Sequence, residues 1–286
     1  MGRPFRKKNT THSLFSEGHR IKTEDDDPRF SNALARGLAI LRAFSIDASL
    51  LGNLEIAERT GLPKSTVSRL TYTLTELGYL RLVEEHTKYE LAAGVLGLAH
   101  PYLVSQPLPH VARPRMEELA VRSKVNVGLG VLEGLSVVYL EYTYGRVDPQ
   151  LLQRPGFRVP LVRTAMGRAC LAGIRSDLRA GLMEELAEYY GDSWNSLRRE
   201  VQDAIEQVES RGYCMAVGAL DPAGIAVGVP YLSSDGRTIM AFNAQSLRHL
   251  HSEKKMMEAG KSLVALAAEM RIALSDARRR AATGKQ

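Results

Sequence analysis

The sequence predicts an α+β protein of two domains, and three observations support this fold class. The chain has 286 residues, a length that favours two domains. Up to about residue 90, apolar side chains recur mainly at helical spacing. Beyond residue 125 the chain contains short apolar segments joined by hairpin turns, with amphipathic helices before and after them. Strands joined by hairpins form antiparallel sheets, so we expect an antiparallel sheet with flanking helices in this second part.

Residues 1–30 lack hydrophobic periodicity and end in the acidic run EDDDP, so we expect a disordered tail there. The next segment, SNALARGLAILRAF, has apolar residues at spacings of three, four and seven, which predicts a first helix. These residues are Leu34, Leu38, Ile40, Leu41 and Phe44. The segment LEIAERT, residues 54–60, predicts a second, short helix that ends at Gly61.

A third helix is predicted to begin at Pro63, where the missing N–H of proline costs no hydrogen bond, and to end at Gly78. Its apolar stripe consists of Val67, Leu70, Leu74 and Leu77. The segments YLRLV and KYELA then alternate like two strands around EEHT, which predicts a small hairpin. This order of helix, helix, glycine turn, helix and two-stranded wing is that of a winged helix-turn-helix domain, which we place at residues 31–93.

The other face of the third helix carries basic and short hydroxyl side chains near its N-terminal half. Such side chains suit base edges and phosphate oxygens, and this half of the helix enters the major groove in helix-turn-helix proteins. The residues predicted to contact DNA are Lys64, Ser65, Thr66, Ser68, Arg69 and Tyr72 of this helix and Lys88 of the wing. In the alternative interpretation, Ser65 only caps the helix while Lys64 and Arg69 are solvated.

The overall charge does not by itself identify a DNA-binding part. The formal net charge is +6, but the seven basic and seven acidic side chains between residues 31 and 91 cancel. The excess lies partly in the tails, in RPFRKK and in a basic C-terminal tail at residues 280–286. A basic N-terminal arm that touches DNA is therefore the alternative to a disordered tail.

Composition also indicates in which cellular compartment the protein is found. No apolar run approaches the roughly 18 residues of a membrane span, and the basic N-terminus lacks the apolar stretch of a secretory signal. The two cysteines, Cys170 and Cys214, provide neither a disulfide framework nor metal-ligand spacing, and we expect both in the core. These features predict a cytoplasmic protein without membrane association.

Pro101, Pro107 and Pro109 interrupt the segment after the wing, so we expect a linker helix at residues 94–110. The second domain, residues 111–279, begins with a helix in ARPRMEELAVRS. Its strands are predicted in NVGLGVLEG, SVVYLEYTYG, YCMAVGAL, IAVGVPYL and TIMAFNAQ, with SSDGR as a hairpin turn. Its other helices are predicted after RVPLVRT, in SDLRAGLMEEL, in SLRREVQDAIEQVESRG and over residues 252–279.

Three partial motifs for chemistry have little support. The segment AGKS at residues 259–262 lacks the first glycine of a phosphate-binding loop, and GLGVLEG at 128–134 has its glycines offset from the dinucleotide-binding spacing. His249 and His251 have no third metal ligand nearby in the sequence. We therefore predict no catalytic residue, no metal site and no cofactor, and so no enzyme.

The segments LARGLAILRAF, LEIAERTGLPKSTVSRLTYTLTELGYL and KYEL resemble the DNA-binding half of the IclR family of bacterial transcriptional regulators. The second half is similar in order and spacing, with RPRMEELA, VVYLE, VPLVRTAMGRACLA, ESRGY and GVPYLSSDGRTIMAF, so the resemblance covers about residues 31–277. It implies a winged helix-turn-helix domain, a GAF-like effector-binding domain, and assembly into dimers or tetramers. It further implies a double-stranded DNA operator and a small organic acid from a catabolic pathway as effector.

The resemblance also implies which residues contact the effector: Thr164, Ala165 and Met166 at the start of the helix in TAMG, and Asn243 and Gln245 in the last strand. Free N–H groups and the positive dipole end at a helix start favour a carboxylate. Asn243 and Gln245 alternate across one residue, so they share a sheet face, and their amides suit a carboxylate or a ring hydroxyl. Thr164 is also a plausible N-cap, and both roles are compatible.

The sequence departs from the family where acidic residues and a cysteine are common, since Ala216 and Val217 follow RGYCM and Ala226 stands in the next strand. A more apolar pocket follows, which disfavours a zinc-dependent variant and favours an aromatic or longer-chain acid. We therefore predict a ligand-responsive, sequence-specific regulator of a catabolic operon. The alternative is a metabolite-binding module whose N-terminal domain pairs with a protein instead of DNA.

Overall fold

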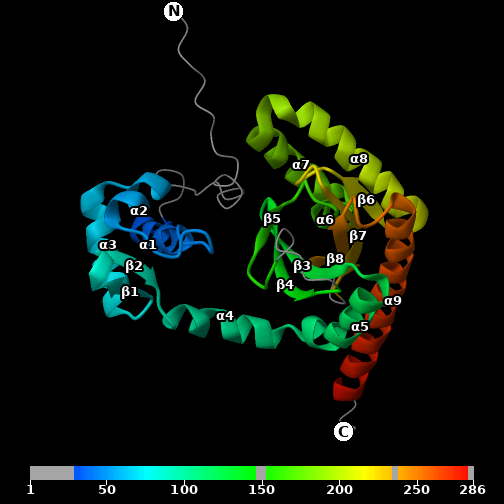
Figure 1. Ribbon diagram of the computed structural model, residues 1–286, viewed down its shortest axis with the longest axis horizontal. Coiled ribbons are helices and arrows are strands. Elements are labelled where there is room, and N and C mark those ends of the chain that lie inside the picture. Colours follow the sequence, from blue (N-terminus) through cyan, green and yellow to red (C-terminus); the bar gives the residue numbers. More distant parts are fainter. Residues whose placement is uncertain (1–28, 146–152, 234–237, 283–286) are drawn as a thin grey trace, which may run out of the picture. The chain divides into compact units, whose positions relative to one another are not determined.

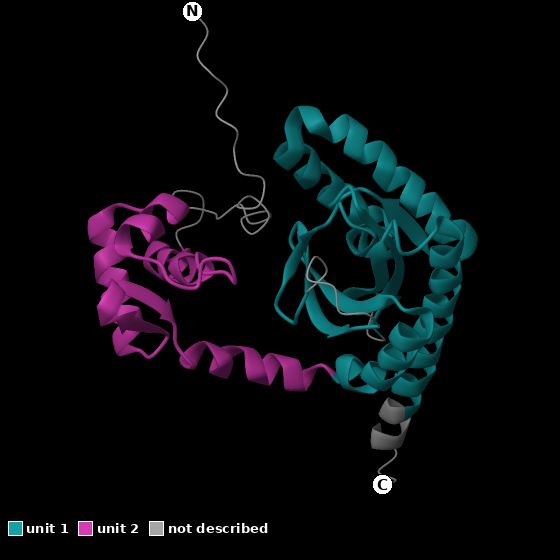
Figure 2. Cartoon of the chain, viewed as in Figure 1, with its two compact units in different colours: residues 1–19, 107–286 teal, residues 20–106 magenta. Residues whose placement is uncertain are grey.

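The computed structural model describes residues 29–145, 153–233 and 238–282. The chain forms two compact units that divide between Gln106 and Pro107, within the segment expected to be the linker (Figure 2). Nearly all of the predicted N-terminal tail, most of the SSDGR turn and most of the basic C-terminal tail lie outside the described residues.

The N-terminal unit contains three helices and a two-stranded wing, followed by a fourth helix, which confirms the predicted winged helix-turn-helix fold (Figure 1). Its elements are α1 (Asn32–Arg42), α2 (Asn53–Thr60), α3 (Lys64–Glu76), β1 (Leu80–Val83), η1 (Glu84–His86), β2 (Lys88–Leu91) and α4 (Gly94–Ser105). Strand β2 also pairs with the chain before α2, because Leu51 and Tyr89 exchange two backbone hydrogen bonds of 3.0 and 2.8 Å. These two hydrogen bonds join the wing to the segment that leads into α2.

The core of this unit differs in part from the predicted apolar stripes. Val67 and Leu74 are buried as expected, but Leu77 is 63% exposed and Thr71 is buried in its place. Leu77 is the C-cap residue, and the left-handed Gly78 (φ 72°) turns the chain away directly after it. Burial of the polar Thr71 side chain does not leave its hydroxyl unsatisfied, because the hydroxyl is hydrogen-bonded to Val67 O at 3.0 Å and Asn53 Oδ1 at 3.2 Å.

Two leucines of the first predicted stripe are also on the surface. Leu34 is 64% and Leu38 is 42% exposed, whereas Ile40 of the same helix is fully buried. The apolar face of α1 is therefore wider than the area that this unit covers.

The prolines of the linker segment fall inside helices. Pro107 and Pro109 lie in the first turn of α5, where backbone N–H groups have no intrahelical partner, so they do not interrupt it. Pro101 lies inside α4 and removes one helical hydrogen bond without ending the helix. The expectation that prolines break the helical pattern was wrong for Pro101 and Pro109, but the chain does leave the helix at Gln106, directly before Pro107.

The C-terminal unit is an antiparallel sheet between two layers of helices, as predicted (Figure 1). Its elements are α5 (Pro107–Ser123), β3 (Asn126–Glu133), β4 (Ser136–Thr143), β5 (Arg158–Pro160), α6 (Ala165–Gly173), α7 (Ser176–Tyr190), η3 (Gly191–Ser193), α8 (Trp194–Arg211), β6 (Cys214–Val217), β7 (Gly224–Leu232), β8 (Ile239–Leu247) and α9 (Glu253–Ala282). The strand order is β5-β4-β3-β8-β7-β6, with every neighbouring pair antiparallel.

Helices α5 and α9 pack on one face of this sheet, and α6, backed by α8, packs on the other. The face toward α6 lacks side chains at two positions. Gly130 and Gly228 face α6, since a Cβ on Gly130 would lie 2.6 Å from Met166 Sδ and one on Gly228 would lie 2.2 Å from the Ala165 carbonyl oxygen. The missing side chains let the start of α6 lie directly against the strands.

Candidate DNA-binding and effector-binding sites

The loop between α2 and α3 sets the position of the candidate recognition helix. Helix α2 ends at Gly61, whose left-handed φ of 70° suits a residue without a side chain, and Pro63 then precedes α3 in extended conformation. The Val67 N–H donates to the Pro63 carbonyl over 3.0 Å, which starts the helical hydrogen bonds.

Most of the residues predicted to contact DNA lie on the open face of α3. Lys64, Ser65, Ser68, Arg69 and Tyr72 are exposed, and Thr66 is half-buried. Neither Lys64 nor Arg69 forms an ion pair within the described part of the chain. Ser65 is not the N-cap of α3, as the alternative interpretation had it, because Ser65 lies inside the helix and no side chain caps its start.

Three later threonines of α3 have a structural use that the sequence did not indicate. Thr71, Thr73 and Thr75 each donate a hydroxyl hydrogen bond to the carbonyl of the residue four positions earlier. Such bonds satisfy the hydroxyl inside the helix. These three threonines of α3 are therefore committed within the helix itself.

Lys88 in the wing is engaged with another element. Its Nζ lies 2.8 Å from Glu55 Oε1, and Glu55 Oε2 accepts the Gly52 N–H over 2.7 Å at the start of α2. The Gly52 N–H and the Lys88 ammonium lower the pKa of Glu55, with the backbone hydrogen bond the larger cause. In this arrangement the charge of Lys88 is shared with a carboxylate.

The start of α6 combines a capped end with free amides. Thr164 is the N-cap: its Oγ1 accepts the Gly167 N–H over 3.0 Å and donates to the Pro160 carbonyl over 3.0 Å. The backbone N–H groups of Ala165 and Met166 donate no hydrogen bond within the described residues. Both residues are buried, so the helix start carries two unpaired donors and the positive dipole end in a sheltered place.

Strand β8 brings the two predicted amides beside this helix start. Asn243 pairs with Gly228, the glycine over which Ala165 lies, and with Gly128 on the other side. Asn243 Nδ2 donates to Tyr139 Oη over 3.1 Å and to Gln245 Oε1 over 3.4 Å, and Gln245 Nε2 donates to Tyr142 Oη. A row of polar groups therefore follows the sheet next to the α6 N-terminus.

Tyr139 and Tyr142 are candidate site residues that the sequence did not indicate, because each is hydrogen-bonded to one of the two predicted amides. Three positions apart in a regular strand, they would point to opposite faces. A β-bulge between Leu129 and Gly130 shifts the register of β3 against β4 and turns both rings to one face, where they meet edge-to-face at 5.5 Å. Burial raises the pKa of both tyrosines well above the ordinary value, so both hydroxyls stay protonated.

One polar atom of this row is unsatisfied. Among the buried side-chain nitrogen and oxygen atoms of the described residues, Asn243 Oδ1 alone has no hydrogen-bond partner. The Asn243 side chain is 3% exposed, so water does not compensate freely for the missing donor. The Tyr139 hydroxyl accepts from Asn243 but donates to no group in this part of the chain.

The apolar substitutions noted in the sequence belong to the same neighbourhood. Ala216 pairs with Ala226, and Ala226 pairs with Gln245, so these residues form one row across β6, β7 and β8. Of the described residues, no group of three or more His, Cys, Asp or Glu side chains is arranged to hold a metal ion. His251 instead lies between Ser246 Oγ at 2.8 Å and the Ser123 carbonyl at 3.1 Å.

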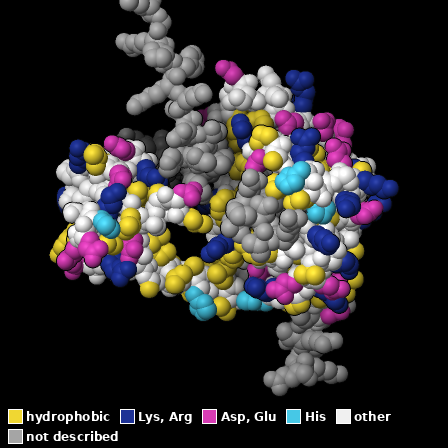
Figure 3. All heavy atoms as spheres, in the orientation of Figure 1, with side chains coloured by type: hydrophobic (Ala, Val, Ile, Leu, Met, Phe, Trp, Pro, Cys, Tyr) yellow, Lys and Arg dark blue, Asp and Glu magenta, His cyan; other side chains and the backbone are white. Residues whose placement is uncertain are grey.

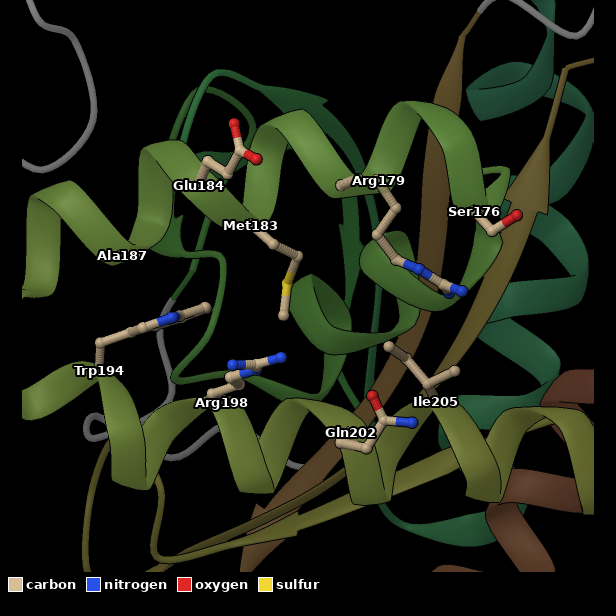
Figure 4. A pocket seen from close by; sticks show the side chains of 10 residues that line it. Ser176, Arg179, Met183, Glu184, Ala187, Trp194, Arg198, Gln202 and Ile205 are labelled. Carbon is tan, nitrogen blue, oxygen red and sulfur yellow. The ribbon is translucent and has the colours of Figure 1, made fainter.

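A separate hollow of about 400 Å³ lies between α7 and α8 (Figure 4). None of the predicted effector-binding residues lines it.

The described helices include none that is both long and apolar enough to cross a membrane.

Two family models match the chain. The IclR helix-turn-helix domain matches residues 33–84, and the model described as bacterial transcriptional regulator IclR C-terminal matches residues 100–272. The first covers α1 to the first strand of the wing, and the second covers nearly the whole C-terminal unit.

Named relatives and a solved structure agree with these matches. The HTH-type transcriptional regulator TsaQ1/TsaQ2 of Comamonas testosteroni is 38% identical over 208 residues, covering 71% of this chain and 74% of that protein. The p-hydroxybenzoate hydroxylase transcriptional activator of Acinetobacter baylyi is 30% identical over 236 residues, covering 79% and 83%. The crystal structure of an IclR family transcriptional regulator from Brucella abortus superposes with a TM-score of 0.77 at 34% identity, covering 88% and 95%. This chain is therefore not an enzyme but a member of the IclR family of bacterial transcriptional regulators.

Proposed function

We propose that the protein binds a roughly palindromic operator through α3 and changes its DNA affinity when a hydroxylated aromatic acid binds between α6 and β8. The observation that carries this proposal is that unpaired hydrogen-bond donors and an unpaired acceptor are buried in the same part of the C-terminal unit. Two buried N–H donors, of Ala165 and Met166, lie near the buried acceptor Asn243 Oδ1, and none of the three has a partner within the described residues.

A molecule with both a carboxylate and a hydroxyl would satisfy the two donors and the acceptor. The carboxylate would accept the free N–H groups and the positive dipole at the α6 start. A hydroxyl would donate to Asn243 Oδ1 and accept from the protonated Tyr139 hydroxyl, which an ether, a second carboxylate or a bare ring cannot do. The ring of Tyr139, which contacts the rings of both Tyr142 and Phe157, favours an aromatic body.

The relatives support this class of effector and of target operon. One relative carries p-hydroxybenzoate hydroxylase in its name as the enzyme whose transcription it activates. The match at 30% identity makes an operon for aromatic-acid catabolism the preferred target for this chain as well.

Self-association is the third part of the proposal, and exposed apolar helices support it. Helix α4 has no buried residue, and its exposed apolar side chains include Leu96, Leu98, Tyr102 and Val104 (Figure 3). Leu34 and Leu38 of α1 are exposed too. Exposed apolar surface of this extent favours a partner, and a second copy would supply two α3 helices about 34 Å apart for successive major grooves.

Fluorescence anisotropy with DNA from upstream of the gene and its neighbours tests this function, with and without 4-hydroxybenzoate. We expect tight binding that weakens steeply with salt and shifts with the acid. Benzoate lacks the hydroxyl and 4-methoxybenzoate lacks its proton, so both should act at least about tenfold more weakly, as expected for a buried polar group left unpaired. Absence of DNA affinity at low salt would favour the protein-pairing alternative, and a stronger effect of 4-methoxybenzoate would contradict the donor role.

A further inference from the structure

Helices α7 and α8 leave an open space between their facing sides. The lining residues recur at helical spacing on each helix, so each helix contributes one continuous stripe. The stripe of α7 consists of Ser176, Arg179, Ala180, Met183, Glu184 and Ala187, and that of α8 of Trp194, Arg198, Gln202 and Ile205. The stripes do not close on each other, and the hollow of about 400 Å³ lies between them (Figure 4).

The floor of this hollow is apolar. Ile205 and Trp194 are buried members of the core cluster of the C-terminal unit, and Met183 and Ala187 pack against that cluster while half-buried. An apolar body of small size would cover these side chains and remove more of their surface from water.

Two guanidinium groups border the floor, one from each helix. In Figure 4 the side chains of Arg179 and Arg198 extend into the space between the helices, whereas the Glu184 carboxylate points away from it. Arg198 has no hydrogen bond or ion pair within the described residues, and the hydrogen bond of Arg179 goes to the Leu171 carbonyl at 3.3 Å. Neither arginine is neutralised by a carboxylate of the described chain.

We propose that this hollow is a second ligand site, which takes a small carboxylate with an apolar body. Guanidinium groups match carboxylates in geometry and charge, and the Met183, Trp194 and Ile205 side chains match an alkyl or aryl group. The volume lies within the range of small-molecule sites, about 300–1,000 Å³. The site does not depend on the proposed effector role of the α6 N-terminus, because the two share no residue.

The hollow is connected to α6, and an effect of its ligand on the effector response is the one part of this inference that rests on the proposed function. Arg179 is bonded to the last turn of α6 through Leu171. The buried Arg168 of α6 forms an ion pair with Glu200 of α8, and Ile205 belongs to the same core cluster as Met166. A ligand that moves α7 against α8 therefore acts on the helix whose first turn holds the free amides, and the coupling must be reciprocal.

The chain provides its own reporter for this site, because Trp194 is the one tryptophan in the sequence. The experiment titrates the full-length protein with phenylacetate and with hexanoate while tryptophan fluorescence is followed. Their neutral amides, phenylacetamide and hexanamide, serve as controls for the charge. We expect a saturable change with the acids and none with the amides at the same concentrations.

Variants distinguish this site from the one at α6. Arg198→Gln and Arg179→Gln should each weaken acid binding at least about tenfold, the usual effect of losing a charged hydrogen bond. Arg199→Gln is the matched control, since Arg199 is the next residue on α8 but does not line the hollow, and it should leave binding unchanged. In Asn243→Leu, which alters the proposed effector site, the acids should still give a saturable change in tryptophan fluorescence.

Three results would overturn the proposal. The first is no saturable change with either acid. The second is a change that survives Arg198→Gln but disappears in Asn243→Leu, which would place the acid at α6. The third is a shift in oligomeric state on Arg198→Glu, measured by sedimentation, without any acid binding, which would make the hollow an interface between copies.

Discussion

At the scale of single residues, Arg69 is an exposed cation on α3 whose charge is not paired within the described residues. If Arg69 reads a base, Arg69→Ala should weaken operator binding by about 1–3 kcal/mol, with a smaller loss on random DNA. Anisotropy on both DNAs measures the difference. Arg199→Ala, which removes an exposed arginine from α8, is the control and should change neither affinity. An equal loss on operator and random DNA would instead identify Arg69 as a phosphate contact.

Two buried thiols and two buried tyrosine hydroxyls should make the free energy of unfolding decrease as the pH becomes alkaline. Burial raises the pKa of Cys214 to about 12, and it also raises the pKa values of Cys170, Tyr139 and Tyr142 well above their ordinary values. In the unfolded chain these groups lose protons first, because their pKa values there are lower. The stability they contribute is therefore complete below about pH 8.5 and declines as pH rises.

We expect the free energy of unfolding to fall above that pH by up to about 1.4 kcal/mol per pH unit for each group that ionises only in the unfolded chain. Urea unfolding between pH 8 and pH 10.5 measures the slope. Cys214→Ala removes one of the groups and should make the slope shallower, even though the variant is less stable at neutral pH. A slope identical to that of the unaltered protein would show that Cys214 does not contribute.

At the scale of elements, the contact between α6 and the sheet depends on Gly228. A methyl group there would lie 2.2 Å from the Ala165 carbonyl oxygen and 3.1 Å from Ala169 Cβ, so α6 would have to move. We expect Gly228→Ala to destabilise the protein by about 1–3 kcal/mol and to weaken the effector response, measured by thermal unfolding and by acid-dependent anisotropy.

Gly181 offers the matched control for that substitution. It lies inside α7, and a Cβ there would meet no atom within 4 Å. Gly181→Ala should therefore stabilise the protein by about 0.5–1 kcal/mol, because alanine loses less backbone entropy in a helix. Destabilisation by Gly181→Ala comparable to that by Gly228→Ala would contradict the steric explanation.

The sequence predicted elements better than it predicted their surroundings. Periodicity located α3 and the burial of Val67 and Leu74, since both follow from local spacing. It misassigned Leu77 because helical spacing does not show that this residue is the C-cap, where α3 has ended and Gly78 turns the chain next. Tyr139 and Tyr142 were missed for a different reason: the bulge that brings them together appears only in the pairing of β4 with β3, and spacing within one strand carries no information about it.

At the scale of the whole molecule, α4 makes self-association testable. Leu96 of α4 is 69% exposed, so Leu96→Asp should cost this chain little stability alone while weakening association of copies. Sedimentation should show smaller species, and operator affinity should fall with them because paired half-sites need paired α3 helices. Val121→Asp on α5 is the control, since Val121 is 67% exposed and lies outside α1 and α4. An unchanged sedimentation profile for Leu96→Asp would place the interface elsewhere.

The sheet of the C-terminal unit ends in its two shortest strands, β5 with three residues and β6 with four. Edge strands present unpaired N–H and C=O groups that can recruit a strand of another molecule, and shortness limits how many such groups an incoming strand finds. Concentrated preparations of this protein should therefore resist cross-β fibril growth through this sheet. If aggregates form on heating, the exposed helical leucines are the more probable nucleus, and detergents that mask apolar surface would suppress them.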